Sequence, residues 1–72
     1  MMIHRKTVMY LIDPYGQIVH VYVPKRSHYR IGQVLNYSLR NASTISGQAI
    51  FGMDLFESEA EAQNRLNELE MN

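Results

Sequence analysis

Cysteine is absent from the 72 residues of this chain. Its absence excludes disulfide bridges and every zinc site that relies on thiolate ligands. A chain this short has room for one small domain, so we expect residues 1–72 to share a single core. Small domains without a covalent or metal staple often gain stability by self-association, and we therefore expect a homodimer.

Long apolar runs are also absent. The first apolar run, residues 8–12, ends at Asp13 after five residues. It is too short for the hydrophobic part of a secretion signal, and no run in the chain approaches the length of a membrane span. Together with the lack of cysteine, this favours a cytoplasmic protein with no membrane partner.

The chain has no net charge, because seven Lys and Arg side chains are matched by seven carboxylates. The balance is uneven along the sequence. Residues 1–40 carry six cationic side chains and one carboxylate, a net charge of +5, whereas residues 41–72 carry one arginine and six carboxylates, a net charge of −5. Such asymmetry indicates either a basic binding surface or charges that compensate each other within the fold or across a dimer.

Catalytic motifs are lacking as well. No serine lies in the glycine pattern of a nucleophile elbow, and the glycines at 47 and 52 are not followed by the Lys of a phosphate loop. His4, His20 and His28 have neither the spacing nor the neighbouring carboxylates of a zinc site. The sequence therefore predicts a protein that is not an enzyme and has no cofactor and no metal site.

The clearest pattern lies between residues 7 and 23. Two apolar runs flank Asp13-Pro14-Tyr15-Gly16, where Asp, Pro and Gly stand as a type I turn followed by a left-handed glycine requires. This predicts a hairpin over 7–23 with a three-residue loop and Asp13 paired with Gln17. One face is then aliphatic and predicted to be buried: Met9, Leu11, Val19, Val21 and Val23. The opposite face carries Val8, Tyr10, Ile12, Ile18, His20 and Tyr22.

The remaining segments predict one more strand and two helices. Residues 30–41 fit two patterns, a helical face and an alternation typical of a strand, and we favour a helix over about 30–41. Alternating apolar residues predict a strand over about 48–56. Ser58 with Glu61 matches a capping box and predicts a helix over 58–70. The expected fold is α+β with the order β-β-α-β-α, a three-stranded antiparallel sheet whose helices pack on its aliphatic face.

Two groups of side chains are candidates for binding. Tyr10, His20 and Tyr22 share the outer face of the hairpin, and Tyr15 lies at its turn. Because tyrosine is favoured at protein interfaces, these four are the predicted partner-binding residues. The candidate phosphate-binding residues come from the two ends of the hairpin and the segment after it: Arg5, Lys6, Lys25, Arg26 and Arg30.

A small non-enzymatic interaction or regulatory module, which docks a protein partner or itself, is the favoured function. In its size and its lack of catalytic apparatus the chain is similar to small accessory proteins encoded by phages and prophages. Nucleic-acid binding is the alternative, with cations on phosphates and tyrosines, Tyr29 among them, stacking on bases. The zero net charge counts against it, since an acidic helix would repel the same polymer.

Overall fold

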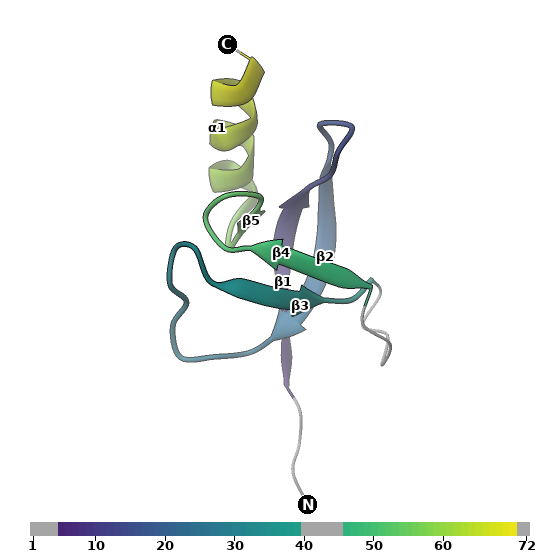
Figure 1. Cartoon of the computed structure of the whole chain (residues 1–72), viewed down its shortest axis with the longest axis vertical. Coiled ribbons are helices and arrows are strands. Elements are labelled where there is room, and N and C mark those ends of the chain that lie inside the picture. The colour runs from purple at the N-terminus through teal and green to yellow at the C-terminus, as the bar shows by residue number, and fades with distance from the viewer. Residues whose placement is uncertain (1–4, 40–45, 71–72) are drawn as a thin grey trace, which may run out of the picture.

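The computed structural model describes residues 5–39 and 46–70. Its elements follow the order β1 (Lys6–Ile12), β2 (Ile18–Pro24), β3 (Val34–Tyr37), β4 (Gly47–Ile50), β5 (Leu55–Phe56) and α1 (Glu59–Glu70) (Figure 1). The fold is thus α+β, with antiparallel strand pairs and a C-terminal helix. Over the described ranges it has one helix and two sheets, where the sequence predicted two helices and one sheet.

The predicted hairpin is confirmed in position and register. β1 and β2 pair residue for residue, from Lys6 opposite Pro24 to Ile12 opposite Ile18. At the turn, the Asp13 N–H donates to the Gln17 carbonyl at 2.9 Å, and the Asp13 carboxylate accepts bonds from the N–H groups of Tyr15 and Gln17, both at 2.9 Å. Gly16 has φ 79°, a left-handed conformation that other residues adopt only with strain. Local turn chemistry therefore fixes the hairpin.

The strands form a circuit that is closed by single bridges. β5 pairs with β1 on the side opposite β2, while β3 pairs with β4. Tyr22 of β2 exchanges two backbone hydrogen bonds with Ser38, directly after β3, at 2.8 and 2.9 Å. Phe51, directly after β4, bridges Leu55 of β5. Neighbouring strands thus follow the order β5-β1-β2-β3-β4, and the last bridge returns to β5.

The hydrophobic core lies inside this circuit and confirms the predicted aliphatic face. Met9, Val21 and Val23 are at most 1% exposed, and Leu11 is 9% exposed. Val19 is partly buried against them. They pack against Leu35 and Ala49 of the second sheet, Phe51 directly after it, and Leu55 of β5.

The helix predicted over about 30–41 is wrong in the part that the structure describes; its last two positions lie outside the described residues. The segment makes a turn and then β3, Val34–Tyr37. Gly32 has φ 94°, which an α-helix does not allow. Leu35 is buried between exposed neighbours, the alternation typical of a strand. Backbone pairing with β4 and, through Ser38, with β2 outweighs the helical pattern.

The strand predicted over about 48–56 is interrupted. β4 covers Gly47–Ile50, a turn follows, and β5 covers Leu55–Phe56. Gly52 in this turn has φ 86°. The Asp54 carboxylate accepts a bond from the Ile50 N–H at 2.8 Å and so closes the turn. The interruption lets β5 return to β1.

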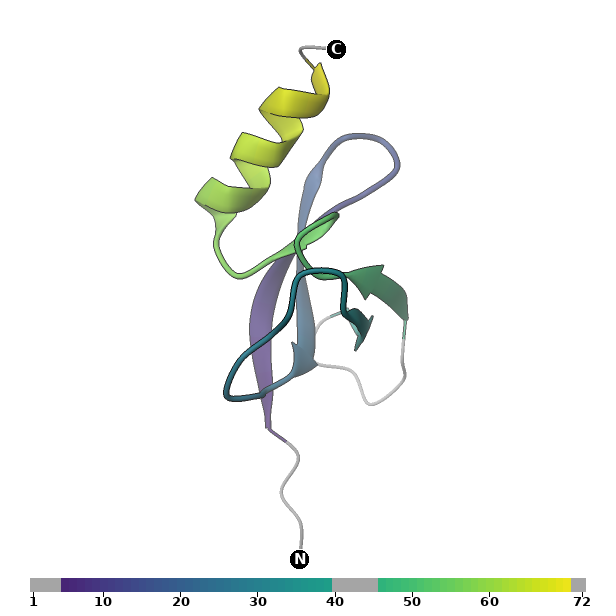
Figure 2. The ribbon, with the colours of Figure 1, turned by 60° about the vertical axis from the view of Figure 1, so that its left-hand side comes forward.

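The C-terminal helix is confirmed, but it packs on a different face from the one predicted. Ser58 Oγ accepts a bond from the Glu61 N–H at 3.2 Å, as a helix cap does. Phe56 pairs with Tyr10, so its side chain lies on the outer face of the hairpin, where it is buried beside the start of α1. Figure 2 shows α1 on one side of the hairpin and the β3–β4 pair on the other. The second sheet, and not a helix, covers the aliphatic face.

Candidate interaction surfaces

The outer face of the hairpin brings three of the four predicted partner-binding residues together. Tyr10 and His20 face each other across the two strands, with ring centroids 4.9 Å apart and ring planes at 81°, an edge-to-face contact. Tyr22 is two positions from His20 on β2 and is half-buried, whereas His20 is exposed. Tyr15 is 89% exposed at the turn, apart from the others. Tyr10, His20 and Tyr22 form what we call the aromatic row.

The outer edge of β2 lies beside this row. In an antiparallel pair, the peptide groups of alternate residues point toward the partner strand and away from it. Asp13 and Gln17 bond each other, so the peptide groups of Ile18, His20 and Tyr22 point away from β1. Tyr22 uses its groups to bond Ser38. Among the described residues, no strand pairs with the outward groups of Ile18 and His20.

Three of the five predicted phosphate-binding residues, Arg5, Lys6 and Lys25, lie at the other end of the hairpin. The Lys25 N–H donates to the Arg5 carbonyl at 2.9 Å, and Lys6 Nζ donates to Ser38 Oγ at 3.3 Å. Arg26 and Arg30 follow on the segment between β2 and β3, residues 25–33, which we call the basic loop. All five side chains belong to exposed residues.

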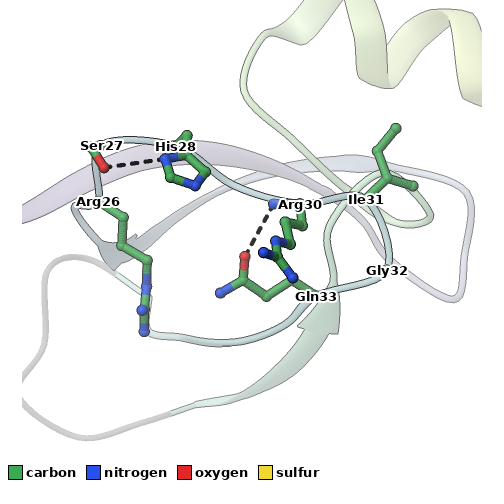
Figure 3. A pocket seen from close by; sticks show the side chains of 7 residues that line it. All are labelled: Arg26, Ser27, His28, Arg30, Ile31, Gly32 and Gln33. Carbon is green, nitrogen blue, oxygen red and sulfur yellow. Dashed lines mark hydrogen bonds between the residues drawn. The ribbon is translucent and has the colours of Figure 1, made fainter.

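The basic loop surrounds an open hollow of about 610 Å³, the loop hollow (Figure 3). Its lining includes Arg26, His28 and Arg30 and no carboxylate. Gln33 Oε1 accepts a bond from the Arg30 N–H at 3.1 Å and closes the far end of the loop. In Figure 3, Ile31 points away from the two arginine side chains.

Tyr29 holds the basic loop in place. Its hydroxyl donates to the Pro24 carbonyl at 2.9 Å and accepts a bond from the Arg26 N–H at 3.1 Å. Its ring stacks on Phe51, with centroids 5.4 Å apart and planes at 28°. This ring is therefore engaged with the core through the face that stacks on Phe51.

A second hollow, of about 490 Å³, lies between the basic loop and α1; we call it the helix hollow. Ile31 and Phe56 supply apolar lining, and carboxylates surround them: Glu57, Glu61 and Glu68. Arg65 also lines it and pairs with Glu68 at 3.5 Å. Sequence reasoning missed this surface, because it placed Ile31 on a helix over about 30–41.

Two further observations concern other classes of site. Within residues 5–39 and 46–70, no three His, Asp or Glu side chains gather in a way that could hold a metal ion. In these ranges, α1 lacks the length and the apolar character that a helix needs to cross a membrane. No protein-family model matches the chain, and neither a curated protein nor a solved structure matches it.

Proposed function

We propose that this chain is a small non-enzymatic interaction module that docks an extended segment of a partner protein along the outer edge of β2. The observation that carries the proposal is the outward-facing peptide groups of Ile18 and His20, which no described strand uses. Open edges of this kind accept a further strand from another chain, and natural proteins otherwise cover or blunt them.

The aromatic row supplies the side-chain part of this site. His20 is exposed beside the outer edge of β2, and its ring contacts the ring of Tyr10 on the neighbouring strand. Added strands gain affinity from backbone hydrogen bonds and specificity from alternate side chains. The fitting partner is thus an extended segment whose alternate residues are apolar or aromatic, so that they pack beside His20 and Tyr22.

Replacing His20 by proline tests the proposal. Proline lacks the N–H, but this N–H points away from β1, and proline is tolerated at such edge positions. We expect His20→Pro to fold and to lose the partner captured by the wild-type chain, while His20→Ala retains the backbone bonds and part of the affinity. Circular dichroism melting checks that both variants fold.

Hydrogen exchange provides the second measurement. The amides of Ile18 and His20 should exchange quickly in the isolated chain and slowly in the complex, while the Val21 amide, which faces β1, is protected in both. Equal capture of the same partner by His20→Pro and the wild-type chain would contradict the proposal.

Nucleic-acid binding is the second candidate, and the carboxylate-free lining of the loop hollow favours it. Binding through Lys25 and Arg26 would weaken steeply with salt, because phosphate contacts release counterions. Titration of labelled single-stranded and double-stranded oligonucleotides at low salt tests it, with the Lys25→Glu, Arg26→Glu double variant as the negative control. An absence of binding at low salt would remove this candidate.

A further inference from the structure

The loop hollow and the helix hollow adjoin at Ile31, which lines both. Ile31 is 81% exposed, a large apolar side chain placed in solvent between two surfaces of opposite charge. The basic side has Arg26 and Arg30 without a carboxylate. The acidic side has three glutamates and one arginine, and so has a net charge of −2.

Within the described residues, several charged side chains on each side form no ion pair. In the part of the chain that the structure describes, the guanidinium groups of Arg26 and Arg30 form no ion pair, and neither do the carboxylates of Glu57 and Glu61. Arg65 and Glu68 form an ion pair within α1. Two surfaces of opposite charge therefore lie side by side, and within the described residues each carries charged groups that form no ion pair.

We propose that this surface binds the same surface of a second copy, in a two-fold dimer with Ile31 near the axis. A two-fold axis applies one surface to itself, so that a residue pair across the interface occurs twice. The two Ile31 side chains then contact each other at the centre. The basic side of each copy covers the acidic side of the other. Arg30 of each copy then faces Glu61 of the other copy, once on each side of the two-fold axis.

Apolar contact at the centre and ion pairs at its margins match the usual anatomy of a protein interface. Arg26 and Arg30 from the basic half of the sequence then lie opposite glutamates from the acidic half of the other copy. This dimer uses a different surface from the outer edge of β2, so either proposal can fail without the other.

The first test removes the apolar centre. Sedimentation equilibrium should give the mass of two chains for the wild-type protein at micromolar concentrations. Ile31→Asp should raise the dissociation constant at least ~tenfold, because it places a charge at the centre of the interface. The matched control is Tyr15→Asp, which makes the same type of change at a side chain that is 89% exposed and distant in the fold. A wild-type mass of one chain, or a dimer that Ile31→Asp leaves intact, overturns the proposal.

The second test exchanges charges and does not depend on stability. Arg30→Glu and Glu61→Arg should each weaken the dimer ~tenfold or more, because each places like charges opposite each other twice. An equimolar mixture of the two variants should restore the dimer, since every contact in the mixed dimer again joins opposite charges. Glu59→Arg is the control, because Glu59 is in the same first helical turn as Glu61 but does not line the helix hollow.

The remaining outcomes are equally decisive. A mixture that stays monomeric overturns the proposal, as does a dimer that both single variants leave intact. Masses that grow beyond two chains with concentration indicate a head-to-tail contact, which contradicts the two-fold arrangement. Loss of the dimer in His20→Pro would place the interface at β2 and overturn the proposal. Loss of oligonucleotide binding in Arg30→Glu, with the dimer mass unchanged, would assign the basic side to nucleic acid and also overturn it.

Discussion

Removing one oxygen atom from Tyr29 should destabilise the basic loop without opening the core. In Tyr29→Phe the ring keeps its stacking position on Phe51, but the loop loses the bond to the Pro24 carbonyl and the bond from the Arg26 N–H. Both bonds join the end of β2 to the basic loop. Their loss therefore acts on the segment that carries Arg26 and Arg30.

The magnitude follows from the number and exposure of the two bonds. A hydrogen bond contributes about 0.5–1.5 kcal/mol net to the free energy of unfolding. Pro24 and Arg26 are exposed, so water can replace the hydroxyl on both backbone groups. The loss should therefore fall in the lowest quarter of the combined range of about 1–3 kcal/mol, at about 1–1.5 kcal/mol. For a domain of this size that lowers the melting temperature by about 4–12 °C.

Urea unfolding followed by circular dichroism measures the difference. The midpoint should fall while the slope m stays the same, because the area buried in the core does not change. Tyr15→Phe is the matched control: its ring is 89% exposed, and its stability should stay within about 0.5 kcal/mol of the wild-type value. If Tyr29→Phe also stays within that limit, the two bonds do not hold the loop and the reasoning is refuted.

Three further substitutions test the core, a turn and the helix cap. Met9→Ala should lower the free energy of unfolding by about 2–5 kcal/mol, because Met9 is 1% exposed in the core. This is a large part of the roughly 4–11 kcal/mol expected for a chain of this length, and urea unfolding measures it. Gly52→Ala should lower the free energy of unfolding by at least about 1 kcal/mol, since the φ of Gly52 is 86° and the new Cβ would lie 3.0 Å from Ile31 Cγ2. Gly32→Ala is the control for backbone strain alone, because Gly32 has φ 94° and a Cβ there would have no atom within 4 Å. Equal losses of stability in the two variants would show that the contact with Ile31 is irrelevant. Ser58→Ala should cost about 0.5–2 kcal/mol and shorten α1 at its start, and an unchanged helical signal and midpoint would contradict the capping role.

The hairpin was predictable because its information is local. Asp13 and Gly16 specify a turn whose geometry is set by four consecutive residues, and the turn fixes the register of both strands. The start of α1 was predictable for the same reason, since Ser58 and the Glu61 N–H are three residues apart. In both elements the stabilising partners are near each other in the sequence.

The segment from 30 to 39 was predicted wrongly because its partners are distant. Leu35 fits a helical face as well as a strand, and the choice depends on pairing with β4 and on the bond between Ser38 and Tyr22. Neither contact can be recognised from the pattern of apolar and polar residues within the segment. The same error prevented prediction of the helix hollow, because Ile31 lines a hollow together with residues of α1 only when the basic loop is not helical.

The candidate sites divide in the same way. Tyr10 opposite His20 followed from the register alone, and the gathering of Arg5 with Lys25 followed from the pairing of the strand ends. The role of Tyr29 as a support, the outer edge of β2, which no described strand covers at Ile18 and His20, and the meeting of the loop hollow and the helix hollow at Ile31 required knowledge of which segments lie side by side.

The sequence by itself determined the hairpin, its aliphatic face and the capped C-terminal helix, because residues that are close in the chain supply the interactions that define them. Only the tertiary structure decided what covers that face, that the segment after the hairpin is a strand, and that Ile31 stands between a basic and an acidic surface. These features depend on contacts between distant segments, and the free energy of those contacts outweighs weak local preference.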